Sequence, residues 1–232
     1  MQRAYDLEIL DGPEHDPSEL EHSLAQVADV NRFLGGDSSL RGALAPLLAL
    51  PGPVQLLDVG AGNAEVALAL VRWARARGRR WRVAALDLHA QTAALAARRT
   101  SAAGSSAGVA VVRGDGLRLP FADGAFDAAF TVLTLHHFRD DPAVALLREM
   151  ARVARRLVVV NDLERSTPAL LGARALAATV WRRNRITKND GPLSVRRAFT
   201  PAELLALAER AGLRRPRVRR RLAFRLVLEA EP

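Results

Sequence analysis

A short run that passes from an apolar strand pattern, through glycines, into an alanine-rich helix pattern constrains this chain most. Residues 54–59 (VQLLDV) fit a buried strand, residues 60–62 (GAG) a tight turn, and residues 64–77 a helix that Gly78 ends. Glycine lets a backbone turn sharply and lets a ligand approach without meeting a Cβ atom. The N-terminus of the helix presents free N–H groups to an anion. The run therefore favours a ligand-binding turn, although an ordinary strand-to-helix turn has the same pattern.

Strand and helix patterns alternate after this turn. Strand patterns cover 81–86, 109–113, 126–132 and 157–160, helix patterns cover 90–102 and 142–154 (with Asp140 or Asp141 as its cap), and a small-residue loop covers 103–108. Such alternation predicts a parallel sheet with helices on both faces, and residues 218–229 add an antiparallel closing hairpin. The expected fold class is α/β, a Rossmann-like, doubly wound and mostly parallel sheet.

Two regions lie outside this alternation. Residues 1–50 predict an N-terminal helical cap: an irregular lead-in over 1–16, a helix that Asp16 caps, and a short helix from Ser38 or Ser39. Residues 51–232 form the expected sheet domain. Within it, residues 164–200 are an insertion long enough to form a lid or substrate wall. We expect a helix over 168–183. Residues 184–199 show no periodic pattern, and residues 189–192 predict a strong turn. A capping box from Thr200 to Glu203 then predicts the start of another helix.

The composition excludes several classes of protein. The net charge is +9, and Lys188 is the only lysine. Because an arginine and alanine excess is typical of a GC-rich genome, the charge alone does not establish a nucleic-acid partner. The absence of cysteine removes disulfides, thiolate metal sites and a cysteine nucleophile, and it is compatible with the cytoplasmic location that we expect. Neither a signal peptide nor a membrane span of roughly 20 apolar residues is expected.

Acidic side chains lie at or just after the carboxyl ends of the first three strands, where open α/β sheets bind ligands. They are Asp58, Asp87 and Asp115. An acid at the position of Asp87 can accept hydrogen bonds from both hydroxyls of a ribose. Asp115 can accept from an adenine amine, and Gly116 offers the ring a backbone N–H. Together these residues predict an adenosine-containing cofactor.

Four segments resemble the class I S-adenosylmethionine-dependent methyltransferases of the small-molecule, ubiquinone-biosynthesis-methylase-like group. They are 56–62 (LLDVGAG), 85–88 (ALDL), 114–121 (GDGLRLPF) and 126–138, in that family's order and spacing. The likeness covers roughly residues 54–163. A run at 190–200 resembles bacterial methyltransferases associated with polyketide pathways. The resemblance implies that S-adenosylmethionine is the cofactor, that S-adenosylhomocysteine is the product, and that residues 51–232 form a methyltransferase domain.

The resemblance also implies which residues contact the cofactor. The methionine part is expected at Gly60, Ala61 and Gly62, the ribose at Asp87, and the adenine at Asp115 and Gly116; Asp58, Leu88 and Leu133 complete the expected set. Ala64 stands where the family often has a third glycine. Because alanine is small, we expect the packing of helix on strand to survive. A methionine carboxylate also demands less of the turn than a pyrophosphate does.

His136, His137 and Asp162 are the catalytic candidates. The histidines follow the fourth strand and Asp162 follows the fifth. This placement of His and Asp resembles the catalytic pair, a histidine base with an aspartate partner, of some sugar and natural-product O-methyltransferases. We expect His136 to act as general base with Asp162 as its partner. The alternative is that the two histidines form a turn after the strand and line the pocket without acting as a base. No metal ligand set is expected.

The sequence does not identify the molecule that accepts the methyl group. The Asn/Asp-Pro-Pro-aromatic signature of N-methylation is replaced by residues 131–134 (TVLT), and a covalent C5-pyrimidine mechanism needs a cysteine. O-methylation of a phenolic, polyketide-like or sugar hydroxyl is favoured over C-methylation of an electron-rich ring. RNA methylation is a less favoured alternative, as is a non-catalytic module that kept the cofactor fold. Candidate wall residues for an enclosed acceptor site are Trp181, Phe199, Phe33 and Phe138.

Overall fold

A seven-stranded sheet with the order β3-β2-β1-β4-β5-β7-β6 forms the centre of the molecule. This computed structural model describes residues 1–104 and 108–232. The strands are β1 (Val54–Val59), β2 (Trp81–Asp87), β3 (Val109–Arg113), β4 (Phe126–Val132), β5 (Ala154–Leu163), β6 (Arg214–Arg221) and β7 (Arg225–Glu231). The strands from β3 to β5 are parallel to their neighbours, and β7 runs antiparallel to β5 and β6. The expected fold class is confirmed.

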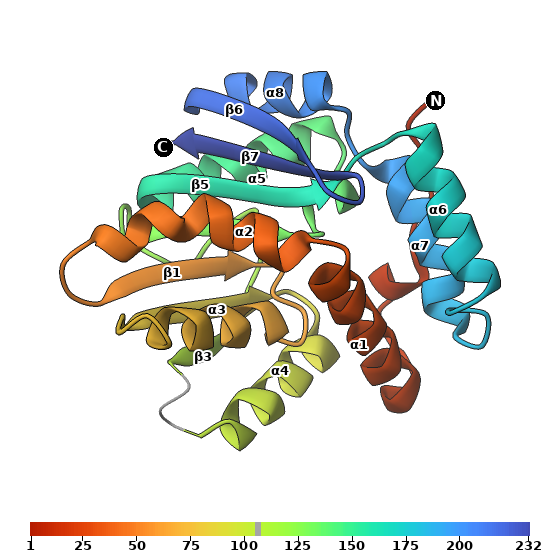
Figure 1. Cartoon of the computed structure of the whole chain (residues 1–232), viewed down its shortest axis with the longest axis horizontal. Coiled ribbons are helices and arrows are strands. Elements are labelled where there is room, and N and C mark those ends of the chain that lie inside the picture. The colour runs from red at the N-terminus through yellow and green to blue at the C-terminus, as the bar shows by residue number, and fades with distance from the viewer. Residues whose placement is uncertain (105–107) are drawn as a thin grey trace.

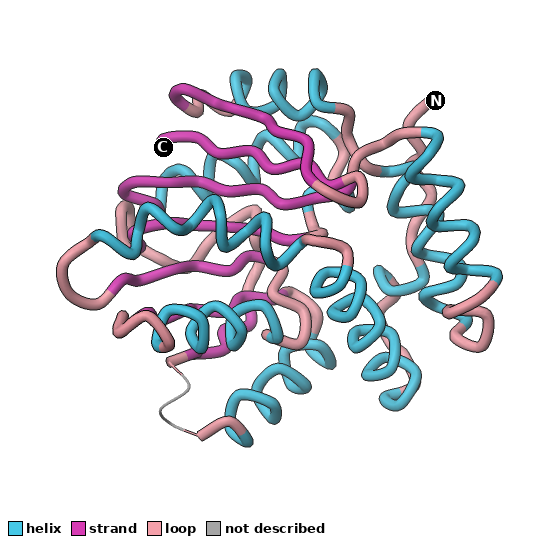
Figure 2. The backbone as a smooth tube through the Cα atoms, in the orientation of Figure 1, coloured by secondary structure: helices cyan, strands magenta, loops and turns pink. Residues whose placement is uncertain are grey.

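Helices cover both faces of the sheet (Figures 1 and 2). They are α1 (Pro17–Phe33), α2 (Gly36–Leu44), α3 (Glu65–Arg75), α4 (Ala90–Ala102), α5 (Asp140–Val153), α6 (Thr167–Ala178), α7 (Arg185–Arg197) and α8 (Pro201–Arg210), with the 3-10 turns η1 (Ile9–Asp11), η2 (Ala45–Ala49) and η4 (Leu135–His137). α2 and α3 pack on one face and α5 and α8 on the other, while α1, α6 and α7 lie beyond the carboxyl ends of the parallel strands (Figure 1).

The sheet separates two apolar layers. Leu57 of β1 packs with α5 and α8, whereas its neighbour Leu56 packs with α2 and α3. Successive side chains of a strand point to opposite faces, so a strand covered on both sides needs a continuous apolar run. The run 157–160 (LVVV) of β5 meets this requirement, and β1 meets it at Leu56 and Leu57. The strand order reverses between β1 and β4, which makes the carboxyl ends of these two strands the place where this type of sheet binds ligands.

Two helix starts form as expected and one does not. The Asp16 carboxylate accepts hydrogen bonds from the backbone N–H groups of Ser18 and Glu19 at the start of α1. Thr200 and Glu203 form the expected capping box at α8. The prediction that Asp140 or Asp141 caps α5 is wrong, because Arg139 is the capping position and both acids lie in the first turn, where the helix dipole favours negative charge.

The segment 184–199 is the largest error of the sequence interpretation. The expected turn at 189–192 lies inside α7, and Pro192 is a helical residue. Tertiary contacts outweigh the breaker residues here. The Asp190 carboxylate accepts hydrogen bonds from the N–H groups of Ile9 and Leu10 at 2.8 and 2.9 Å, and a Cβ on Gly191 would lie 2.4 Å from the ring of Trp181. The preceding helix, α6, correspondingly ends at Ala178 rather than at residue 183.

Three smaller differences concern segment bounds. The lead-in is irregular as expected except for η1, and it is fastened to the rest of the molecule, since the Ala4 N–H donates to the carbonyl of Arg196. α2 begins at Gly36 rather than at Ser38 or Ser39, and β5 is longer than expected. The expected loop over 103–108 includes residues 105–107, which lie outside the described residues. In the described ranges, no helix has both the length and the apolarity that a membrane crossing requires.

Candidate active site

The glycine turn after β1 adopts backbone conformations that side chains disfavour. Gly60 and Gly62 have φ angles of +73° and +55°. A Cβ on Gly60 would lie 2.4 Å from a methyl carbon of Thr134, which follows β4. Ala64 also has a positive φ, of +60°, which gives a physical reason for the glycine that the family often has at this position. The turn is thus held between β1 and the end of β4.

Two carboxylates flank this turn, the buried Asp58 and the half-buried Asp87. Asp58 is 1% exposed, and its Oδ2 accepts no hydrogen bond within the described part of the chain. Burial, with the nearby charge of Asp87, raises the pKa of Asp58 well above its ordinary value. Asp87 accepts from the N–H groups of Gly62 and His89, each at 2.9 Å. Burial raises the pKa of Asp87 despite these bonds. Asp87 therefore ties the end of β2 to the turn after β1.

A cavity of about 630 Å³ lies over this edge of the sheet. All the expected cofactor-binding residues line it, namely Asp58, Gly60, Ala61, Gly62, Asp87, Leu88, Asp115, Gly116 and Leu133. We call this the first cavity. Leu88 is exposed at its edge, and the carboxylate of Asp115 accepts from the N–H of Leu117 at 2.8 Å. The topology brings together residues that are far apart in the sequence because parallel strands end at a common edge.

His136 and Asp162 form a buried pair at the ends of β4 and β5. Nδ1 of His136 lies 2.7 Å from Oδ1 of Asp162, and the His136 backbone N–H donates to Oδ2 of the same carboxylate. His136 is 3% exposed. Burial alone would raise the pKa of Asp162, but the charge and hydrogen bonds of His136 keep it below its ordinary value. The carboxylate thus fixes both the backbone and the ring of His136.

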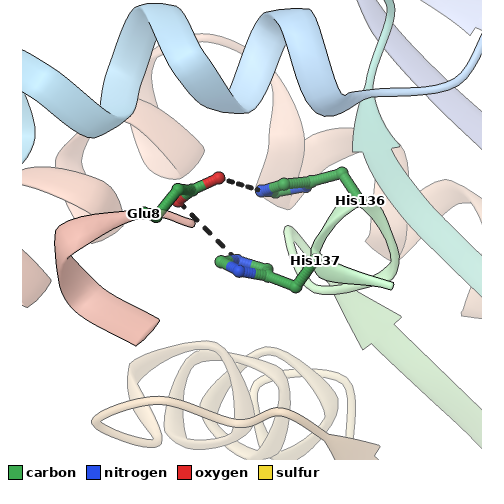
Figure 3. A group of neighbouring side chains, drawn as sticks. All are labelled: Glu8, His136 and His137. Carbon is green, nitrogen blue, oxygen red and sulfur yellow. Dashed lines mark ion pairs between the residues drawn. The ribbon is translucent and has the colours of Figure 1, made fainter. Parts of the chain in front are cut away.

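His137 has a carboxylate partner of its own, and a third acid faces both histidines (Figure 3). Nδ1 of His137 lies 2.7 Å from Oδ1 of Asp11. Glu8 places Oε1 3.5 Å from Nε2 of His136 and Oε2 3.9 Å from Nε2 of His137. Glu8 is 5% exposed, and burial raises its pKa to about 7 although His137 and Arg197 oppose the shift.

Glu8 and Asp11 are site residues that the sequence interpretation missed. Both belong to the acidic lead-in, which contains no motif, and no spacing rule relates them to the histidines. Arg197 holds this lead-in in place: its guanidinium donates to the Asp11 carboxylate at 2.8 Å and to the carbonyl of His137 at 2.7 Å. Nothing in the local sequence pattern would have identified these contacts.

A second cavity of about 360 Å³ adjoins the first. Its walls come mainly from α1, α6 and α7 and are mostly apolar, and Glu8, His136 and Asp190 are among the polar residues that line it. Four residues line both cavities: Leu10, Val27, Leu133 and His137. Leu133 has a φ of +54°, a strained conformation that commonly marks functional sites. The two cavities thus meet beside the histidines.

Two of the four expected wall residues line these cavities. Trp181 lines the second cavity and Phe138 lines the first. The other two expectations are wrong. Phe33 is 71% exposed because it is the last residue of α1 and points away from the packed core. Phe199 is buried in the layer beneath α5 and α8, where the Arg3 guanidinium lies 3.7 Å from the centre of its ring.

Comparison with known proteins places these features in context. Residues 57–158 match the family described as methyltransferase domain. The demethylmenaquinone methyltransferase of Mycolicibacterium paratuberculosis is 39% identical over 152 residues, which are 64% of this chain and 56% of that protein. The demethylmenaquinone methyltransferase of Roseiflexus sp. is 35% identical over 138 residues, 58% of this chain and 52% of that protein. The chain thus spans about half the length of these curated relatives.

Solved structures share the fold at low sequence identity. A SAM-dependent methyltransferase from Aquifex aeolicus has a TM-score of 0.65 and 19% identity, and the match covers 94% of this chain and 98% of that one. The magnesium protoporphyrin IX methyltransferase of Synechocystis, with bound SAH, has a TM-score of 0.58 and 15% identity, over 95% of this chain and 89% of that one. These likenesses concern the arrangement of the sheet and its helices.

Proposed function

We infer that this chain, which carries a methyltransferase domain and the fold of class I S-adenosylmethionine-dependent methyltransferases, transfers a methyl group from S-adenosylmethionine to a small-molecule acceptor. The main observation in support of this proposal is that the two cavities adjoin each other. The first cavity is lined by every residue expected to bind the cofactor, and it joins an apolar second cavity beside two histidines.

The residues of the first cavity fit the cofactor. Asp58 Oδ2 is a buried oxygen without a partner in the described residues, and it suits the ammonium group of a methionine. Each oxygen of Asp87 already accepts one backbone N–H and retains a lone pair for a ribose hydroxyl. We assign the adenine to Asp115 and Gly116. The cofactor supplies an activated methyl group on its sulfonium, so the protein has to align the acceptor with it.

The second cavity indicates the kind of acceptor. Its described lining contains no lysine or arginine and is mostly apolar, which suits a small, largely apolar molecule such as a phenolic or polyketide-like metabolite. We propose O-methylation of a hydroxyl group on it. The N-terminal cap supplies α1 to the walls and the insertion supplies α6 and α7, so we assign these two regions to acceptor selection.

His136 is the proposed general base for the hydroxyl. Because the Asp162 carboxylate accepts from Nδ1–H, Nε2 of His136 keeps the lone pair that can take the proton. His137, which lines both cavities, is assigned to the positioning of the acceptor. A base of this kind typically contributes about 10²–10⁴-fold to the rate.

C-methylation of an electron-rich ring is the second candidate. The observation in its favour is that the curated relatives in the comparison are named demethylmenaquinone methyltransferases. RNA methylation is less well supported, because Arg113 is the one arginine or lysine in the described lining of the two cavities. The position of the labelled methyl group in the product, on oxygen or on carbon, decides between the two small-molecule reactions.

The experiment combines calorimetry with a screen of acceptors, using S-adenosylmethionine labelled in its methyl group. We expect the chain to bind S-adenosylmethionine and S-adenosylhomocysteine and to label a phenolic acceptor. His136→Ala should lower turnover at least a hundredfold with little change in cofactor affinity, whereas His22→Ala, on the exposed side of α1, should change neither. Failure to bind either cofactor form would reject the proposed function. Full turnover of His136→Ala would reject the base.

A further inference from the structure

We propose that Glu8, His136 and His137 bind a divalent transition-metal cation at the junction of the two cavities. One ligand atom from each residue can be chosen so that all three lie within 4.8 Å of one another. The rings of the two histidines are stacked with their centres 4.4 Å apart and their planes inclined by 30°. Both rings therefore present Nε2 on the same side, toward the Glu8 carboxylate (Figure 3).

The outer partners of both histidines have the arrangement typical of metal ligands. Asp162 holds Nδ1 of His136 and Asp11 holds Nδ1 of His137, each at 2.7 Å. A carboxylate on Nδ1–H fixes the ring orientation and leaves the lone pair on Nε2, and metal-binding histidines almost always have such a partner. Here two neighbouring histidines have one each, and both lone pairs converge.

Glu8 supplies the independent observation that this arrangement is built for a ligand. Its side chain is almost completely buried, and Oε1 accepts no hydrogen bond within the described part of the chain. A buried carboxylate oxygen that faces two nitrogen lone pairs needs positive charge between them, either a proton or a metal ion, to offset the repulsion. The distances of 3.5 and 3.9 Å exceed those of hydrogen bonds, so Glu8 does not simply accept a proton from either ring.

Arg197 is the competing cation near this group. Its Nε lies 3.7 Å from Oε1 of Glu8, which is too long for a hydrogen bond. The same guanidinium donates to Asp11, to the carbonyl of Asp6 and to the carbonyl of His137. Arg197 is therefore used chiefly to fix the lead-in and the histidine turn, and it leaves Glu8 Oε1 available to a metal.

The donor set selects the class of metal. Two imidazoles with one carboxylate suit Zn²⁺, Fe²⁺, Co²⁺ or Mn²⁺ and leave coordination positions open. All three side chains line the second cavity. On the proposed function, which this step assumes, a cation here would hold the oxygen of the acceptor beside the methyl group. Binding of a cation to Nε2 of His136 and proton transfer to that nitrogen exclude one another, so the metal content of the active protein decides which role His136 has.

The test uses Co²⁺ as the probe, with the full chain stripped of metal by dialysis against a chelator. We expect one equivalent of Co²⁺ to bind and to give visible absorption bands of a nitrogen- and oxygen-ligated ion. Glu8→Gln and His137→Gln should each weaken binding at least tenfold, and Asp11→Asn should weaken it about 10–100-fold by releasing the ring of His137. The matched controls Glu14→Gln and His22→Gln, both exposed, should bind as the unmodified chain does.

Circular dichroism and S-adenosylmethionine affinity establish that each variant is folded. If His137→Gln is not folded by these criteria, Glu8→Gln provides the test of the metal site. Absence of saturable one-to-one Co²⁺ binding, or equal binding by Glu8→Gln, would overturn the metal site. S-adenosylmethionine binding and methyl transfer by the stripped chain are measured separately. A chain that binds Co²⁺ without binding S-adenosylmethionine would instead refute the proposed function and leave the metal site standing.

Discussion

Replacing Gly60 by alanine tests whether the turn after β1 depends on the close approach of Thr134. The φ of +73° at this residue costs an alanine about 1–2 kcal/mol relative to glycine. The new Cβ would also lie 2.4 Å from Cγ2 and 2.5 Å from Oγ1 of Thr134, and overpacking of this kind costs about 1–3 kcal/mol. We therefore expect Gly60→Ala to lower the free energy of unfolding by about 2–5 kcal/mol.

Gly52 provides the matched control. Its φ is +78°, and nothing lies within 4 Å of a Cβ placed there. Gly52→Ala should therefore show the backbone cost alone, about 1–2 kcal/mol. The excess loss in Gly60→Ala isolates the contact with Thr134. Adding Thr134→Ala removes Cγ2 and Oγ1 and leaves only a Cβ at 3.0 Å, so the double variant should recover most of this excess.

Urea unfolding of Gly60→Ala, Gly52→Ala, Thr134→Ala, the double variant and the unmodified chain measures these free energies, and calorimetry with S-adenosylmethionine reports on the turn itself. We expect Gly60→Ala to weaken cofactor binding and Gly52→Ala to leave it unchanged. The reasoning is refuted if Gly60→Ala costs no more than Gly52→Ala. It is also refuted if Thr134→Ala adds its own cost to that of Gly60→Ala without any coupling between the two.

Three further predictions concern the same edge of the sheet and the insertion. The folded pKa of Asp58 lies above its ordinary 3.8, so this carboxyl binds more protons in the folded state than in the unfolded chain, and its own contribution to stability is lost as pH rises above about 4. Asp58→Asn should therefore raise the melting temperature at pH 8 and lose this advantage toward pH 4, and parallel curves would contradict the assignment. Asp87→Ala should weaken S-adenosylmethionine binding about ten- to a hundredfold, as expected for lost hydrogen bonds to a charged group, and an unchanged calorimetric affinity would exclude the ribose contact. Gly191→Ala would place a Cβ 2.4 Å from the ring of Trp181 and should lower stability by about 1–3 kcal/mol in urea unfolding, with Trp181→Leu restoring part of the loss.

The sheet was predictable because its signals are local. Residues 54–59 place apolar side chains on both faces of the strand, Leu56 on one and Leu57 on the other, and the structure covers both faces of β1. Asp58, Asp87 and Asp115 meet at one cavity because parallel topology brings strand ends together, a rule that needs no knowledge of side-chain contacts. The pair of His136 with Asp162 follows from the same rule, since β4 and β5 are neighbours.

The remaining features depend on contacts between distant segments. Gly191 and Pro192 are breakers by local propensity, yet they lie in α7 because Asp190 bonds to the lead-in and Trp181 covers Gly191. Glu8 carries no motif, and only the folded chain places it against the histidines. Phe33 was misassigned because helical spacing does not by itself reveal which face of α1 is covered.

The attachment of the lead-in also bears on the order in which the molecule assembles. Residues 8–11 contact Asp190, Arg197 and His137, so each contact closes a loop of more than a hundred residues. Contacts of such long range form late in folding, because the entropy of closing the loop is lost before the contact gains anything. We therefore expect the sheet and its glycine turn to form first and the junction of the two cavities to close last. Because Leu10, Asp11 and Pro13 of the same lead-in also line the first cavity, the docking of this segment would then complete both cavities in a single late step.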